Sequence, residues 1–284
     1  VEFFFFRSFL IFFNIKKIEN FIEIGHDELF LENIKKFNIS KSENDLYIFN
    51  KDQINKFDLA SQDKLECKKV LNSIKLDENQ KYVCLHVRDS EFYRDQDRRT
   101  FRNSNIKNYY ELIRTLVSRD YVVIRMGKAA RDRLEISDGK KIIDYAFSDF
   151  KNNKMDFFLG KYCKFHISGG GGFTQIPNLF NRACLWTNDY RIYNELPLNP
   201  LSRKIFKKII WKKNKKEISL REYIDMPYSY HHVRYINQDI DFVENSAELL
   251  DNTIRSYIEL FNNKKNFQLK KLQLKFNDFI FSRL

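Results

Sequence analysis

Short apolar runs and helical repeats alternate along the middle of the chain. Between the runs, apolar residues recur at helical spacing in Ser104–Ser118, Asn153–Tyr162 and Thr174–Phe180, which predicts helices. The alternation predicts a parallel sheet with right-handed crossovers, an α/β, Rossmann-like domain with helices on both faces. The predicted strands are Tyr82–Val87, Tyr121–Met126, Lys141–Ala146, Lys164–Ser168 and Ala183–Asn188.

The pattern divides the 284 residues into three regions. Residues 1–75 are mixed in character, and we expect them to be part of an N-terminal domain in a chain that begins mid-protein. Residues 76–262 hold the alternating pattern, which loosens after Asn188 into a basic stretch, Arg203–Lys216, and closes with an amphipathic helix over Asn245–Phe261. Residues 263–284 form a basic tail. The opening apolar run is broken by Arg7 and is shorter than the ~20 residues of a membrane span.

Charge and cysteine content bear on whether the protein binds nucleic acid, a metal ion or a membrane surface. The net charge is +12, but Lys, Asn, Ile, Phe and Tyr are abundant throughout, and such a bias produces basic proteins without a dedicated basic patch. No common nucleic-acid motif is present, so we expect no nucleic-acid partner. The four cysteines form no C-x-x-C pair, which favours free thiols in the cytoplasm and no metal site. The basic stretches Arg203–Lys216 and Lys264–Lys275 are expected to be solvated charge, with contact with the inner face of a membrane as the alternative.

Polar residues concentrate where the predicted strands end. Ligands of open parallel sheets bind at the carboxyl ends of the strands, so these residues are expected to converge on one site. At or just after the end of the first strand they are His86, Arg88 and Asp89; of the second, Arg125 and Gly127; of the third, Asp144 and Tyr145; and of the fourth, Ser168 with Gly169, Gly170, Gly171 and Gly172.

The glycine run is the most specific of these signals. Only eight glycines occur in the chain, and four of them are consecutive. Glycine permits positive φ and close approach to backbone N–H groups. Between a strand and a helix, those N–H groups point at an anion near the positive end of the helix. The run predicts an anion-binding loop, with a flexible turn as the alternative.

The charged residues around this loop have two interpretations each. Arg88 and His86 share a face of their strand, and the planar guanidinium of Arg88 suits a phosphate. Asp89 and His86 are the candidate catalytic residues. Asp89 is either a general base or the residue that orients Arg88. His86 either donates a hydrogen bond to the phosphate or the sugar, or is a core histidine. Arg125 interrupts an apolar strand, so it pairs with a carboxylate such as Asp144 or contacts the ligand. Arg102 lies on the following loop, as a phosphate contact or a solvated charge.

The blocks VCLHVRDSEFY, FRNSNIKNYYELI, VIRMG, IIDYA and KFHISGGGGFTQIPNLFNRACLWTN resemble a family of bacterial glycosyltransferases associated with surface-polysaccharide loci. The similarity covers roughly Lys81 to Ile224. The strand that ends in His-x-Arg also looks like the donor-binding strand of the GT-B fucosyltransferases. Where this chain has four glycines, the family has a Ser/Thr-Gly loop, so the resemblance implies that any hydroxyl contact is lost or moves to Ser168 or Thr174.

The resemblance implies a metal-independent GT-B glycosyltransferase of the hexosyl or deoxyhexosyl type, with no cofactor. Its donor is a nucleoside-diphosphate sugar, and its acceptor is a surface glycan or a lipid-linked precursor. Arg88 is expected to contact the diphosphate, helped by His86, Arg102, Arg125 and the glycine loop, while Asp144 and Tyr145 line the nucleotide site. A non-catalytic nucleotide-binding module of a polysaccharide assembly system is the alternative.

Overall fold

The computed structural model describes residues 58–74, 76, 80–91, 97–190, 199, 201–226 and 239–262. From Leu59 onward these residues belong to one compact unit, Leu59–Asn266. The unit therefore begins before the expected boundary at residue 76 and includes a helix, α4 (Ser61–Ser73). The expectations for residues 1–57 and for the basic tail, with its segment Lys264–Lys275, lie outside the described residues.

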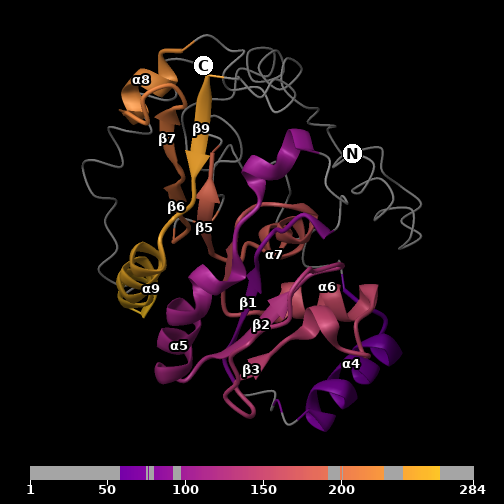
Figure 1. Cartoon of the computed structure of the whole chain (residues 1–284). Coiled ribbons are helices and arrows are strands. Elements are labelled where there is room, and N and C mark those ends of the chain that lie inside the picture. The colour runs from indigo at the N-terminus through magenta and orange to yellow at the C-terminus, as the bar shows by residue number, and fades with distance from the viewer. Residues whose placement is uncertain are drawn as a thin grey trace, which may run out of the picture. The chain divides into compact units, whose positions relative to one another are not determined.

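A six-stranded sheet forms the centre of the unit (Figure 1). The strand order is β3-β2-β1-β4-β5-β6, and every neighbouring pair is parallel. This topology confirms the Rossmann-like α/β class. The strands are β1 (Tyr82–His86), β2 (Val122–Met126), β3 (Ile142–Ile143), β4 (His166–Ser168), β5 (Cys184–Asp189) and β6 (Arg203–Phe206).

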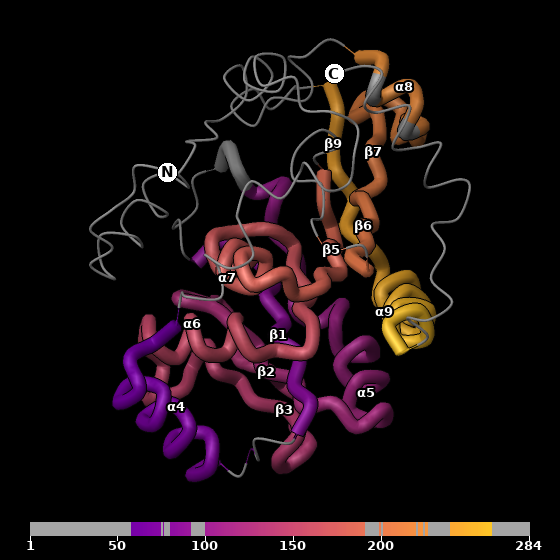
Figure 2. The backbone as a smooth tube through the Cα atoms, turned by 180° about the vertical axis from the view of Figure 1, so that it is seen from behind, coloured from indigo at the N-terminus to yellow at the C-terminus, as the bar shows by residue number. Residues whose placement is uncertain are grey.

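Helices cover both faces of this sheet (Figures 1 and 2). One face carries α5 (Tyr110–Ser118) and α9 (Ala247–Asn262). The other carries α4, α6 (Asn153–Tyr162) and α7 (Gln175–Leu179). Successive side chains of β1 pack against the helices on alternate faces of the sheet, as expected for a strand that is covered on both sides.

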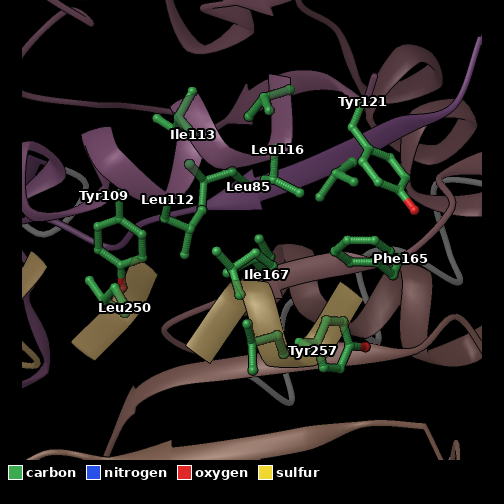
Figure 3. Close-up of a cluster of buried hydrophobic side chains, with 14 of the residues drawn as sticks. Leu85, Tyr109, Leu112, Ile113, Leu116, Tyr121, Phe165, Ile167, Leu250 and Tyr257 are labelled. Atoms are coloured by element: carbon green, nitrogen blue, oxygen red, sulfur yellow. The ribbon is translucent and has the colours of Figure 1, made fainter. Parts of the chain in front are cut away.

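The main hydrophobic core lies between the sheet and the α5–α9 pair (Figure 3). Val83 and Leu85 of β1 belong to this core with 0% exposure. Tyr82 and Cys84, which alternate with them, face the opposite layer, where the Tyr82 hydroxyl and the Cys84 thiol both donate hydrogen bonds to the Leu159 carbonyl of α6, at 3.1 and 3.5 Å. Cys84 and the other three cysteines are buried and free.

Most element predictions match the structure, and the differences are local. The predicted helix over Ser104–Ser118 begins as a 3-10 turn, Ile106–Tyr109, whose N-cap Asn105 accepts a hydrogen bond from the Lys107 amide at 3.0 Å. The predicted strand over Lys141–Ala146 is shorter, because Tyr145–Phe147 forms another 3-10 turn.

The chain beyond residue 188 is more regular than its sequence indicates. Besides β6, it forms an antiparallel three-stranded sheet in the order β8-β7-β9. Its elements are β7 (Lys208–Trp211), β8 (Glu217–Ile218) and β9 (Ile240–Val243), with the short helix α8 (Leu220–Ile224) after β8. The basic stretch was expected to be solvated charge. Part of it is instead ordered strand, because Lys204 of β6 forms an ion pair with buried Asp189 at 2.8 Å.

Among the helices that the structure describes, none combines the length and the apolar character needed to span a bilayer.

Candidate functional site at the carboxyl ends of β1 and β4

The strand order reverses between β1 and β4, which is the position where open α/β sheets bind ligands. His86, the last residue of β1, is paired in register with Ser168, the last residue of β4. The Gly169 amide then donates a hydrogen bond to the His86 carbonyl at 3.2 Å. The two strand ends that carry the sequence-predicted residues are therefore adjacent at this switch point.

The glycine loop is shaped by its own contacts. Gly170 and Gly171 have φ values of 91° and 124°, a region that side chains disfavour. A Cβ on Gly171 would lie 2.9 Å from Cε1 of His86. The Gly170 amide donates to Ser168 Oγ at 3.0 Å. The Gly170 N–H was expected to face an anion, and here it forms a hydrogen bond within the loop.

The two hydroxyls of this loop point inward. Ser168 Oγ and Thr174 Oγ1 are 2.6 Å apart and share a hydrogen bond, and both residues have 0% exposure. The resemblance implied that a ligand contact through a hydroxyl is either lost or made by one of these two residues. In the structure they close the base of the glycine loop.

His86 lies against the Gly171 backbone, with the Phe173 ring 6.0 Å from its own. Burial lowers the pKa of His86 to about 4, and the nearby guanidinium groups of Arg125 and Arg88 act in the same direction. The imidazole is therefore neutral at pH 7. Its contribution to an anion site is a hydrogen bond rather than a positive charge.

Arg88 follows β1 and is 8% exposed. Its Nη1 donates to the Asn103 side-chain oxygen at 3.2 Å, and its carbonyl accepts from the Ser104 amide at 2.9 Å. The chain after β1 thus comes back to Arg88 at Asn103 and Ser104, which both form hydrogen bonds with it. Arg102 ends a 3-10 helix, Asp97–Arg102, in this segment and is 7% exposed, so it is buried rather than a solvated loop charge.

Arg125 on β2 is 1% exposed and is held by carboxylates. Its Nη1 lies 3.1 Å from Asp144 Oδ1 and 2.9 Å from the Asp132 carbonyl. Its Nη2 lies 3.9 Å from Asp89 Oδ2. Of the two expectations for Arg125, pairing with Asp144 is the one observed.

Asp89 anchors backbone at the strand ends. Its Oδ1 accepts from the Glu91 amide at 3.0 Å, and its Oδ2 accepts from the Arg131 amide at 2.9 Å. The contacts seen for Asp89 thus connect the segment after β1 to the segment after β2. They differ from the expectation that Asp89 orients Arg88.

Tyr145 and Gly127 serve packing. Tyr145 has 0% exposure, and its hydroxyl donates to the Asn152 carbonyl at 3.1 Å, so the side chain lies in the interior rather than on the surface of a nucleotide site. A Cβ on Gly127 would lie 3.3 Å from the Ala146 Cβ. Gly127 therefore allows the end of β2 to approach the turn after β3.

Lys207 was not predicted as a site residue, because it lies in the basic stretch that was expected to be solvated charge. Lys207 connects β6 to β7 and is 3% exposed. Its Nζ donates to the carbonyls of Phe101 at 2.9 Å and Asn103 at 2.7 Å. No local sequence signal distinguishes it from the neighbouring lysines, because its burial depends on a segment about a hundred positions earlier.

Two further features bear on ligands. Within the described ranges, no three His, Cys, Asp or Glu side chains gather as a group able to hold a metal ion. A hollow of about 490 Å³ lies among Val117, Ile136 and Ile142. It is near the amino ends of β2 and β3, at the opposite edge of the sheet from the switch point.

Comparison with known proteins adds one distant likeness. No protein-family model matches the chain, and no curated protein matches it in sequence. The structure is similar to that of E. coli ADP-heptose LPS heptosyltransferase II, with a TM-score of 0.43 and 14% sequence identity. The match covers 72% of this chain and 54% of that one, so the chain spans about half the length of that protein. The fold assignment here rests on the sheet topology.

Proposed function

We propose that this unit is the donor-binding part of a GT-B glycosyltransferase that acts on a surface glycan or its lipid-linked precursor in the cytoplasm. The observation that carries the proposal is the position of Arg88 at the switch point, two residues after His86, whose ring contacts the glycine loop that follows β4. A diphosphate needs positive charge and hydrogen-bond donors at a strand-end crevice, and the guanidinium of Arg88 offers both.

In the proposed complex, the guanidinium of Arg88 binds the diphosphate of the donor. Neutral His86 donates or accepts one hydrogen bond at the same edge, and Arg102 adds positive charge from the segment after β1. The sugar C1–O bond to the diphosphate breaks while a bond to an acceptor hydroxyl forms. The products are the glycoside, a nucleoside diphosphate and the hydroxyl proton. Arg88 stabilises the charge that builds up on the leaving diphosphate.

A second candidate function is nucleotide-sugar binding without transfer. The observation in its favour is that Asp89, the expected base, accepts two backbone N–H groups and lies beside Arg125. A carboxylate engaged in this way is poorly placed to take a proton from an acceptor hydroxyl.

A thermal-shift screen of nucleotide sugars tests the shared part of both candidates. A ligand that binds only the folded protein raises its melting temperature, so we expect at least one nucleoside-diphosphate sugar to do so, with the matching nucleoside monophosphate giving a smaller rise. Equal, negligible shifts across ADP-, GDP-, UDP-, CDP- and dTDP-sugars contradict the proposal.

Turnover separates the two candidates. A ligand found in the screen is incubated with the protein and a glycan extract, and released nucleoside diphosphate is measured. Release that depends on both extract and protein supports the transferase, and tight binding without release supports the binding module.

A further inference from the structure

We propose that Lys207 is a positioning residue for the diphosphate site: its buried ammonium fixes the segment that holds Arg88 and adds positive charge beside it. The inference rests on the proposed function and deepens it. Lys207 lies far from Arg88 in sequence. The fold brings it into contact with Phe101 and Asn103, in the segment between β1 and α5 that also contacts Arg88.

The contacts of Lys207 are directed at the backbone of this segment. The Phe101 and Asn103 carbonyls accept its two hydrogen bonds, and they flank Arg102. Asn103 is also the residue whose side-chain oxygen accepts from Arg88 at 3.2 Å. The Lys207 ammonium thus fixes the backbone on both sides of Arg102. It also fixes Asn103, whose side-chain amide orients Arg88.

The same segment has a second, apolar anchor. The Phe101 ring packs edge-on against Tyr190, with ring centroids 4.8 Å apart, and lies 5.4 Å from the ring of Phe242 on β9. Aromatic packing of this kind fixes the segment whether or not a charge lies beneath it. A buried lysine is a costly way to add two more hydrogen bonds, since burial of an ammonium is unfavourable unless it is well paired. Because the aromatic packing already fixes the segment, we assign the buried lysine a role that depends on its positive charge.

Three charged groups lie near Lys207. Arg88 approaches from the end of β1, while Glu244 and Asp241 approach from β9 and the residue after it. Burial lowers the pKa of Lys207 to about 8. The effect of Glu244 opposes this shift, and Arg88 reinforces it. A lysine that is cationic at neutral pH but neutral in mild alkali makes the positive potential at Arg88 dependent on pH.

The sign of this dependence differs for binding and for stability. Anion affinity falls as the pH rises through about 8, because the Lys207 charge is lost. Folding stability from this group rises over the same range, because the unfolded chain, with an ordinary lysine pKa of 10.5, binds more protons than the folded one. A loss of affinity above pH 8 is therefore not explained by loosening of the fold at Lys207.

The test compares Lys207→Met and Lys207→Arg with Lys208→Met in the full chain. Lys208 is the neighbouring lysine, has a side chain 61% exposed and pairs with Glu217, so it controls for net charge. Binding of ADP, GDP and UDP is measured by calorimetry, with the melting temperature of each variant recorded. At neutral pH we expect Lys207→Met to weaken binding about tenfold, and Lys208→Met to change it less than twofold.

A pH series supplies a readout that loss of packing would not produce. Wild-type affinity is expected to fall as the pH rises through 8, whereas Lys207→Arg, which stays charged, keeps its affinity. Any titration of the nucleobase appears equally in both proteins and cancels. The series also decides the matter if Lys207→Met fails to fold.

The possible failures are distinguishable. Wild-type protein that binds none of the three diphosphates overturns the proposed function, and this inference with it. Wild-type binding that is abolished by Arg88→Ala but unchanged by Lys207→Met, or equally dependent on pH in wild type and Lys207→Arg, overturns the role of Lys207 alone.

Discussion

Two buried arginines at neighbouring strand ends have different surroundings. Arg125, at the end of β2, lies between Asp144 and Asp89, and the fold neutralises its charge. Arg88, after β1, is oriented by the neutral amide of Asn103 and lies beside the Lys207 cation. The same residue type at the same sheet edge thus lies between two carboxylates in one place, and beside an amide and a second cation in the other.

The largest expected effect is on stability, through Arg125→Met. Removal of one partner from a buried ion pair leaves an uncompensated charge, so we expect a loss of about 3–5 kcal/mol in the free energy of unfolding. Denaturant unfolding measures it. Arg88→Met should cost less, because it also removes the repulsion between Arg88 and the Lys207 cation, and an equal loss for the two variants would remove the contrast between the arginines.

An exposed ion pair provides the control for Arg125→Met. Lys141 pairs with Asp120 at 2.9 Å, with side chains 39% and 91% exposed. We expect Lys141→Met to change the free energy of unfolding by less than about 1 kcal/mol.

Gly171→Ala tests the loop on the Arg88 side. The positive φ and the close approach of His86 Cε1 both oppose a side chain here, so we expect a loss of about 1–3 kcal/mol. Gly139→Ala is a matched control, because Gly139 also has positive φ, at 45°, but a Cβ added there would meet nothing within 4 Å. If Gly139→Ala costs as much, the His86 contact contributes nothing to the effect.

His166 on β4 predicts a smaller, pH-dependent effect. It has 0% exposure, and burial lowers its pKa from 6.5 to about 3. The unfolded chain binds the proton first, so stability falls as the pH drops below about 6.5. From pH 7 to pH 5.5 we expect His166 to account for about 1 kcal/mol of the loss. His166→Leu should flatten the decline in unfolding free energy by this amount, and an unchanged slope would contradict the assignment.

The sequence predicts the parts of the fold that depend on local pattern. The helix Asn153–Tyr162 has the predicted bounds, and β1, β2, β4 and β5 overlap their predicted ranges. The strand β6 was missed because its sequence, RKIF, begins with two basic residues. It is half-buried, it pairs with β5, and its Lys204 forms an ion pair with Asp189 of that strand. The small sheet that follows depends on pairing between β7 and β9, which are far apart in sequence.

The site shows the same division. Convergence of His86 and the glycine run follows from the rule that strand ends meet at one edge, and the structure places them together. The partner of Asp89 and the burial of Lys207 depend on which side chains the fold brings close. The glycines likewise look like a ligand loop in sequence, yet Gly171 is also needed for the His86 contact.

Arg88→Ala tests the central claim most directly. Calorimetry with ADP, GDP and UDP is carried out on wild type, Arg88→Ala and Arg119→Ala, whose exposed arginine follows α5 at the opposite edge of the sheet. A charged hydrogen-bond partner is worth about 1.5–3 kcal/mol, so we expect Arg88→Ala to bind the preferred diphosphate at least tenfold more weakly, with Arg119→Ala unchanged. Equal affinity of Arg88→Ala and wild type would contradict the assignment of the diphosphate site.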